Sequence, residues 1–221
     1  MKRYDQISPY YPVFVNIHDR KCLVVGGGNV ALRKVQSLLE HGANVEVVSP
    51  TLCPELSQMA GEGAIQALQR GYRAEDLQDA LLAVAATDDS EINESVAAEA
   101  RQRGVLVNVV DDPQHSDFIA PSYFSRGDVI VAVSTSGRSP ALARKIRTRL
   151  EKDFGTEYAQ LALLVEEVRS DLRRQGVTVS SDAWQEVLEL DPLVELLKYG
   201  KRREAKEIMV ERLKGPGEKN L

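Results

Sequence analysis

Short apolar runs alternate with helical patterns over the first half of the chain. The runs predict strands at residues 22–25, 45–48, 65–68, 81–86 and 105–110. Apolar residues at helical spacing predict helices at residues 30–41, 54–60 and 91–103. In the first of these helices the apolar residues fall at i, i+4, i+7 and i+8 from Ala31, and Gly42 follows as a natural helix stop. Strands and helices that alternate at this spacing predict right-handed strand–helix–strand units and a Rossmann-type parallel sheet, the α/β class.

The pattern changes after residue 111. Residues 112–128 hold two prolines, a glycine and several polar residues, so we predict a loop or boundary there. A strand is predicted at 129–133, and a turn then leads into a helix that ends near residue 152. Ser139 suits the N-cap of this helix, and Pro140 suits its first helical position.

The rest of the chain is helical in composition. Gly176 and the pair Asp191-Pro192 are expected to divide it into three helices. The chain is therefore expected to contain a dinucleotide-binding Rossmann domain, a dimerisation and substrate segment, and a small C-terminal helical domain. The boundaries predicted for these three parts are residues 1–112, 113–152 and 153–221.

Composition and charge exclude several classes of protein. Of the 221 residues, 43% are hydrophobic and 28% charged, as in ordinary globular proteins. Lys plus Arg total 28 and Asp plus Glu 33, a net charge of −5, which argues against a nucleic-acid partner. No apolar run approaches the roughly 18 residues of a membrane span, and the first residues lack a secretory signal. Cys22 and Cys53 make no disulfide scaffold, so we expect a cytoplasmic protein without a membrane partner.

A glycine-rich segment follows the first predicted strand. Residues 26–31, GGGNVA, fit the dinucleotide pattern G-x-G-x-x-A, with a strand before, a helix after and a second strand beyond. Gly26 permits the tight turn, Gly28 lets the backbone approach a pyrophosphate, and Ala31 keeps helix and strand close. The alternative is a structural glycine-rich turn in a domain that binds no dinucleotide.

The ends of the other strands supply further candidate cofactor contacts. The second strand lacks the usual acidic residue for the adenine ribose and continues instead into Ser49, Pro50 and Thr51. A hydroxyl can bind the ribose, and no Lys or Arg in 49–54 attracts a 2′-phosphate, so NAD is modestly favoured over NADP. Thr87 and Asp88 are expected to border the nicotinamide or its ribose. They equally suit the acidic start of the next helix.

Polar residues also end the strand predicted at 105–110. Asn108 is a candidate cofactor contact, with a loop-stabilising side chain as the alternative. A carboxylate at Asp111 can take a proton from a substrate bound beside the cofactor. Position alone favours Asp111 as a turn residue over Asp111 as a base. His115 is a weaker candidate for proton transfer or metal binding, since a lone histidine in a loop more often does neither. No CxxC or HExxH motif is present, and we expect no preformed metal site.

These motifs together resemble one family, precorrin-2 dehydrogenase, the unit that also forms the N-terminal part of bacterial siroheme synthase. The resemblance covers roughly residues 10–155. It rests on the segments PVFV (12–15), CLVVGGGNVALRK (22–34), AATDD (85–89), NVVD (108–111), DFIAPS (117–122) and VAVSTSGRSPALAR (131–144).

The resemblance implies an activity and a set of residues. Family members oxidise precorrin-2 to sirohydrochlorin with NAD, some also insert ferrous iron, and they are homodimers joined by the central segment. The family's essential aspartate falls on Asp111, which makes it the first choice for general base. Cofactor contacts fall on Asn29, Val30, Pro50 and Thr51. Thr135 stands where siroheme synthase has a serine that is phosphorylated in some members.

A basic helix offers a physical check on this substrate. Residues 138–152 hold six Lys or Arg residues and one acid, Glu151. Such a helix suits a polycarboxylate such as precorrin-2. We therefore predict substrate contacts at Arg138, Ser139, Arg144 and Lys145. The alternative is an ordinary solvated helix face. A different class of protein, a non-catalytic NAD-sensing regulatory domain, would share the glycine loop and the sheet but would not need Asp111.

Overall fold

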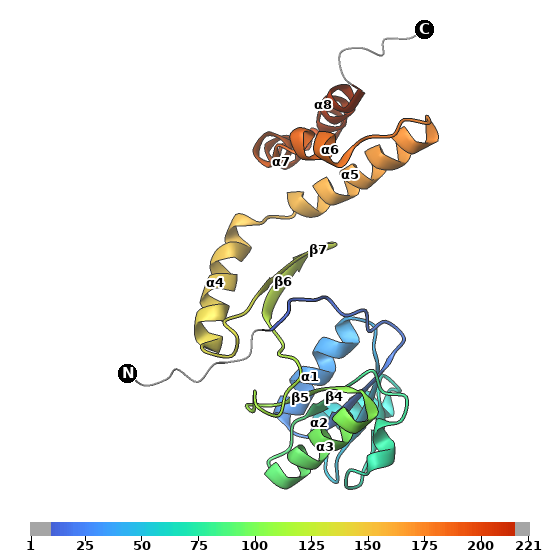
Figure 1. Ribbon diagram of the computed structural model, residues 1–221, viewed down its shortest axis with the longest axis vertical. Coiled ribbons are helices and arrows are strands. Elements are labelled where there is room, and N and C mark those ends of the chain that lie inside the picture. Colours follow the sequence, from blue (N-terminus) through green and yellow to red (C-terminus); the bar gives the residue numbers. More distant parts are fainter. Residues whose placement is uncertain (1–9, 215–221) are drawn as a thin grey trace. The chain divides into compact units, whose positions relative to one another are not determined.

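The computed structural model describes residues 10–214, and its elements are labelled in Figure 1. The chain divides into two compact units, with the boundary between Ala120 and Pro121. The three-part division at residues 112 and 152 remains a prediction. Each unit is described by itself.

The first unit is built on a five-stranded parallel sheet with strand order β3-β2-β1-β4-β5. Its strands are β1 (Lys21–Val25), β2 (Asn44–Val48), β3 (Gln66–Leu68), β4 (Leu82–Ala85) and β5 (Leu106–Val109). Its helices are α1 (Asn29–Glu40), α2 (Pro54–Gly61), the 3₁₀ turn η1 (Ala74–Leu77) and α3 (Ser90–Arg103). The predicted Rossmann-type sheet is confirmed. The strand order reverses between β1 and β4, and ligands of such sheets bind beside that point.

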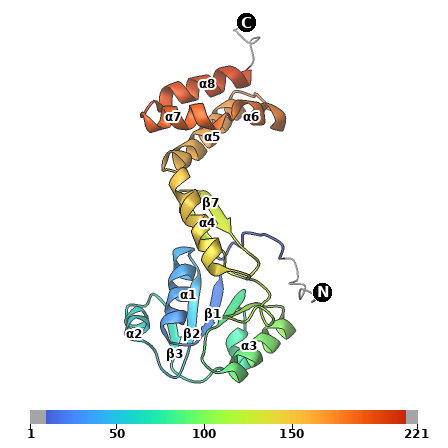
Figure 2. The same cartoon turned by 90° about the vertical axis from the view of Figure 1, so that its left-hand side faces the viewer.

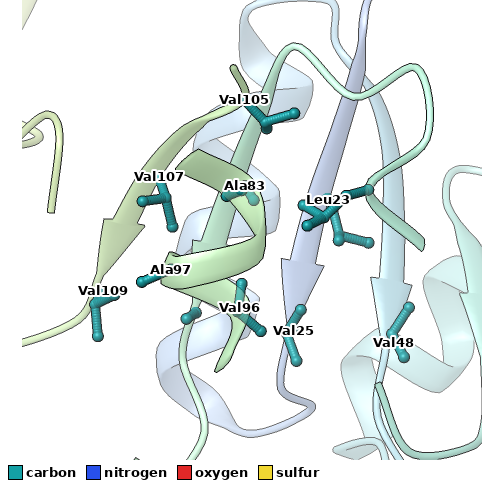
Figure 3. Close-up of a cluster of buried hydrophobic side chains, with 12 residues drawn as sticks. Leu23, Val25, Val48, Ala83, Val96, Ala97, Val105, Val107 and Val109 are labelled. Atoms are coloured by element: carbon teal, nitrogen blue, oxygen red, sulfur yellow. The ribbon is translucent and has the colours of Figure 1, made fainter. Parts of the chain in front are cut away.

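Both faces of the sheet are covered, which explains why most residues of its strands are apolar. Val96, Ala97 and Ala100 of α3 pack against one face in a cluster that includes Leu23 and Val107 (Figure 3). The other face is covered by α1 and α2, and Figure 2 shows α1 and α3 on opposite sides of the strands. This packing fixes the ends of the strands, where the candidate site residues lie.

The second unit begins with an antiparallel pair of strands, β6 (Ser122–Arg126) and β7 (Val129–Val133). The prediction of a loop over residues 112–128 was therefore wrong for its second half. The residues of β6 are mostly polar, but Phe124 is buried and meets the ring of Phe154 edge-on at 6.1 Å. Pairing with β7 and packing of this one side chain stabilise a strand that local sequence does not indicate.

Five helices complete the second unit: α4 (Pro140–Asp153), α5 (Glu157–Arg174), α6 (Ser181–Val187), α7 (Leu190–Lys198) and α8 (Arg202–Lys214). The last four share one apolar core. The expectation of three helices after residue 156 was wrong, because the described chain forms four. Asp191 and Pro192 lie in the first turn of α7 rather than between helices. Proline is tolerated there because the N–H it lacks has no partner within the helix.

Across residues 10–214, no helix combines the length and the apolar character needed to cross a membrane.

Candidate functional site

A backbone hydrogen bond just beyond the strand end joins each of the loops after β1, β4 and β5 to a neighbouring strand. The Gly26 N–H donates to the Val48 carbonyl (2.9 Å), Ala86 N–H to Val25 (2.8 Å), and Val110 N–H to Ala85 (2.9 Å). These bonds hold the glycine loop, the Thr87 segment and the Asp111 segment along one edge of the sheet. The structure thus brings together the residues predicted for the cofactor and the base in this unit.

Two glycines of the loop are required by neighbouring backbone. Gly26 has φ +128°, and a Cβ there would lie 2.3 Å from the Ala86 carbonyl oxygen. A Cβ on Gly27 would lie 1.9 Å from the Thr51 carbonyl oxygen. The loop after β2 therefore packs directly on Gly27, a residue that the sequence pattern treats as variable. No local signal marks this role, because the contact comes from a different strand end.

Gly28 differs from both. Nothing lies within 4 Å of a Cβ built there, and its backbone is extended. Gly28 is the N-cap of α1, whose first turn has no acidic residue and no side-chain cap, so its N–H groups are available to an anion. Asn29 is exposed and Val30 half-buried beside it. This open cradle fits the pyrophosphate of a dinucleotide.

The loop after β2 places its residues unequally. The Ser49 side chain is buried, and its hydroxyl donates to the Thr51 carbonyl at 2.8 Å. Pro50 and Thr51 are exposed. Thr51 therefore presents the open hydroxyl at this end of the sheet, whereas Ser49 is committed to its own loop. A ribose contact for Ser49, Pro50 or Thr51 stays a prediction.

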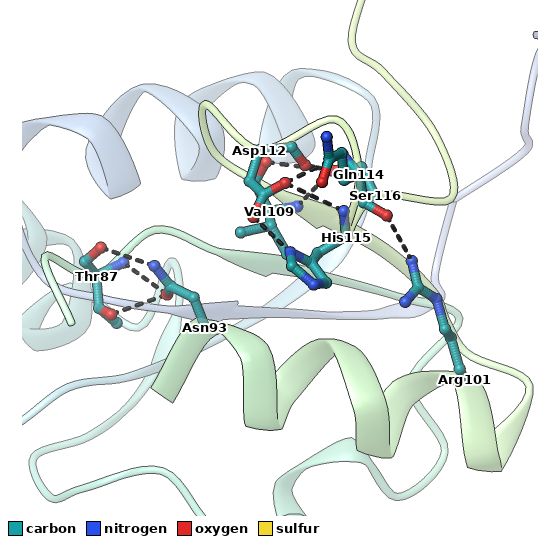
Figure 4. A network of polar contacts seen from close by, with 8 residues as sticks. All are labelled: Thr87, Asn93, Arg101, Val109, Asp112, Gln114, His115 and Ser116. Atoms are coloured by element: carbon teal, nitrogen blue, oxygen red, sulfur yellow. Dashed lines mark hydrogen bonds and ion pairs between the residues drawn. The ribbon is translucent and has the colours of Figure 1, made fainter. Parts of the chain in front are cut away.

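Thr87 is tied to α3 by Asn93, as Figure 4 shows. The Thr87 hydroxyl and the Asn93 carbonyl oxygen lie 2.8 Å apart, and the Asn93 amide donates to the Thr87 carbonyl at 3.0 Å. Asp88 is exposed, and Asp89 caps α3 by accepting from two backbone N–H groups. Asp89 thus fills the helix-start role, which leaves Asp88 open for the predicted cofactor contact.

The segment after β5 forms a tightly bonded loop (Figure 4). The Ser116 hydroxyl accepts from the Val109 N–H (2.9 Å) and lies 2.7 Å from the Asp112 carbonyl oxygen. His115 Nδ1 lies 2.5 Å from Asp112 Oδ2. That bond lowers the pKa of Asp112. Desolvation opposes this shift, and the backbone N–H groups that donate to Asp112 add to it. The Asn108 side chain is buried, and its amide donates to the Phe118 carbonyl at 2.9 Å. This bond is the one expected of the loop-stabilising alternative.

Asp111 projects from this rigid loop. Its backbone is left-handed, with φ +60°, a conformation that aspartate and asparagine adopt more readily than other side chains. The side chain is exposed, and its charge acts on Lys34 of α1. Burial lowers the pKa of Lys34, Arg33 lowers it further, and Asp111 opposes both. The Lys34 ammonium makes no hydrogen bond or ion pair with another residue in 10–214. Lys34 was not among the residues predicted from sequence.

The described residues contain no group of three or more His, Cys, Asp and Glu side chains placed to hold a metal ion. The dinucleotide cradle and the exposed carboxylate of Asp111 are the chemical features that this edge of the sheet presents.

Comparison with known proteins identifies the family. Residues 13–122 match the family described as "Putative NAD(P)-binding", and residues 126–152 match "Sirohaem biosynthesis protein central". The solved structure of "SirC, precorrin-2 dehydrogenase" is 30% identical, with a TM-score of 0.72 over 90% of this chain and 98% of that one. The chain belongs to the precorrin-2 dehydrogenase family.

Siroheme synthases match this chain over part of their own length. Those of Thioalkalivibrio sulfidiphilus and Stutzerimonas stutzeri are 43% and 40% identical, over 90% and 96% of this chain. The matches span 41% and 46% of those proteins. The chain therefore spans less than half the length of these curated relatives.

The residues predicted for the substrate lie in the second unit of the chain. Ser139 caps α4, its hydroxyl accepting from the Leu142 N–H at 3.2 Å, as predicted. Arg138, Arg144 and Lys145 are exposed and form no ion pair within the described part of the chain. Arg147 of the same helix pairs with Glu151 instead. The Thr135 hydroxyl bonds to the backbone of Ser139 and supports the turn before α4.

Proposed function

We propose that this chain oxidises precorrin-2 to sirohydrochlorin with NAD. The reaction removes a hydride from a ring carbon and one proton from the macrocycle, and bound NAD accepts the hydride. The Asp111 carboxylate accepts the proton. Gly26, Gly28, Asn29 and Val30 hold the pyrophosphate end, and Thr87, Asp88 and Asn108 border the nicotinamide side.

One observation carries this proposal: an exposed carboxylate stands on a rigid loop at the same sheet edge as an open dinucleotide cradle. The left-handed backbone of Asp111 is held between the Val110 bond to β4 and the Ser116 bonds to β5. A backbone held in this way restricts where the Asp111 carboxylate can lie, and a general base needs such positioning relative to its substrate. A domain that only sensed NAD would have no use for this carboxylate. Iron insertion, which some family members perform, is not part of the proposal.

For the substrate, we propose that Arg138, Ser139, Arg144 and Lys145 bind carboxylates of precorrin-2. The three basic side chains are exposed and have no acidic partner among residues 10–214, so their charges are available to a ligand. Ser139 adds the start of α4, where backbone N–H groups favour anions. Cys22 and Cys53 are unpaired, as in proteins of reducing compartments, and we propose that the reaction takes place in the cytoplasm.

We further propose a homodimer formed through β6 and β7. Antiparallel sheets that face water on one side alternate apolar and polar residues, but β7 reads Val-Ile-Val-Ala-Val. Ile130 on β7 and Leu142 on α4 are exposed. A two-stranded sheet is marginal alone and has open edges, so a second copy that extends it satisfies both features.

The substitution Asp111→Asn tests the reaction. Asparagine tolerates the left-handed backbone, so the loop is retained while the proton acceptor is lost. We expect kcat/KM for precorrin-2 oxidation, followed by NADH absorbance, to fall about 10²- to 10⁴-fold. NAD affinity measured by calorimetry should stay within about twofold. Activity above a tenth of the wild-type rate in Asp111→Asn would reject the role of this carboxylate.

A further inference from the structure

The backbone of one basic residue, Arg70, lies at the edge of the sheet where the adenine ribose is expected. Strand β3 pairs with β2, and the Ser49 N–H donates to the Leu68 carbonyl at 3.1 Å. The Arg70 N–H donates to the same carbonyl at 2.9 Å. The backbone of Arg70 is therefore a close neighbour of Ser49 at the end of β2. In dinucleotide-binding sheets, an acid at this strand end binds the ribose 2′-hydroxyl, and a nearby Arg accommodates a 2′-phosphate.

The Arg70 side chain does not remain at that edge. Its guanidinium donates to both carboxylate oxygens of Asp76, with Nη1–Oδ2 at 2.9 Å and Nη2–Oδ1 at 2.6 Å. Asp76 Oδ2 also accepts the Arg73 N–H at 2.8 Å, and Asp76 is only 4% exposed. A forked pair of this kind fixes both position and orientation.

The charges around the pair show where the guanidinium is held. The charges of Asp76, Glu46 and Glu75 act on Arg70, and that of Lys21 acts on Asp76. Glu46 lies in the middle of β2 and Lys21 begins β1, so two of the charges that act on the pair lie back along the sheet from its carboxyl edge. Burial would raise the pKa of Asp76, but the bonds from Arg70 and the Arg73 N–H outweigh it and lower that pKa. The carboxylate is thus charged at neutral pH.

We propose that Asp76 determines the cofactor preference of this site by holding Arg70 away from the ribose 2′ position. With Arg70 bound to Asp76 and no Lys or Arg in residues 49–54, neither the loop after β2 nor Arg70 offers a free cation to a 2′-phosphate. The site then takes the dinucleotide without that phosphate. The inference rests on the proposed function only for the presence of a dinucleotide in the cradle.

The first test frees Arg70. Asp76→Asn keeps the volume and an acceptor for the Arg73 N–H but removes the charge that holds the guanidinium. We expect calorimetry to show NADP⁺ binding about tenfold tighter than in wild type, with NAD⁺ affinity within about twofold. The double variant Arg70→Gln, Asp76→Asn should lose the gain. Glu75→Gln is the matched control, because it removes a neighbouring exposed acid whose charge also acts on Arg70 but leaves both Arg70–Asp76 hydrogen bonds in place.

A second variant avoids the buried pair in case Asp76→Asn does not fold. Gln69 is exposed, directly follows β3, and Gln69→Arg places an unclamped cation at the same edge. NADP⁺ binding should again tighten about tenfold, whereas Gln66→Arg, at the opposite end of β3, should change nothing. Unchanged NADP⁺ affinity in Gln69→Arg and in folded Asp76→Asn would overturn the proposal. Failure of wild-type protein to bind NAD⁺ would instead reject the proposed function.

Discussion

Gly27 and Gly28 are neighbours, but each lacks a side chain for a different reason. A Cβ on Gly27 would collide with the Thr51 backbone, whereas a Cβ on Gly28 would enter open space. Gly27→Ala is therefore expected to destabilise the fold by on the order of 1–3 kcal/mol, as overpacked residues do. Gly28→Val is expected to retain the fold and to lose roughly 1 kcal/mol of folding stability, because valine is a poorer N-cap residue than glycine. It is expected to weaken NAD⁺ binding at least about tenfold.

Thermal denaturation and NAD⁺ calorimetry on both variants separate the two effects. Gly61→Ala is a suitable control, since nothing lies near its Cβ position and it ends α2 away from the cradle. Equal losses of stability in Gly27→Ala and Gly28→Val, with equal NAD⁺ affinities, would show that the cradle does not face the cofactor.

For single residues, the sequence predicted the positions of those whose roles are local. It did not predict interactions that depend on partners distant in the chain. Gly26 and Asp111 follow strands directly, so their places at the strand ends could be predicted. The bond of Asn108 to Phe118 and that of Thr87 to Asn93 depend on how later segments fold back. No spacing rule reveals such bonds. The partial burial of Lys34 and the effect of the Asp111 charge on its pKa likewise depend on tertiary packing.

Elements with a strong period were predicted within a few residues, and elements held by tertiary contacts were not. The stripe of α1 and the apolar run of β4 each determine their own structure, because one face or both must be buried. Strand β6 has no such run and depends on β7 and on Phe154. Its polar residues resemble a loop until its partners are known.

Removing single charges from helix α4 tests whether it binds the substrate. Arg144→Ala and Lys145→Ala each remove an exposed, unpaired charge, and we expect each to raise KM for precorrin-2 about 2- to 5-fold with kcat unchanged. Added salt should raise the KM of the wild type and reduce the difference in KM between the wild type and each variant. Lys152→Ala, in the last turn of the same helix, is the charge-matched control. Wild-type KM values in both variants, independent of salt, would mean that α4 does not contact the substrate.

For the whole molecule, the dinucleotide cradle lies in one unit and the basic helix in the other. Sequence predicted both parts, because each has its own local pattern. The boundary between Ala120 and Pro121 was harder to predict from sequence, because residues 112–118 are bonded to β5 and so belong to the sheet domain. Bonds of that kind leave no trace in composition.

Assembly of two copies is the remaining prediction at this scale. Ile130→Glu places a charge on the exposed face of β7, and burying that charge against a second copy would cost several kcal/mol, on the order expected for unpaired ions. We expect sedimentation to show the wild type at twice 24.4 kDa and the variant at 24.4 kDa. Leu163→Glu on α5 changes another exposed apolar residue outside this sheet and should leave the dimer intact. If Ile130→Glu stays dimeric, or the wild type is monomeric, β7 does not form the interface, and its apolar outer face has another cause.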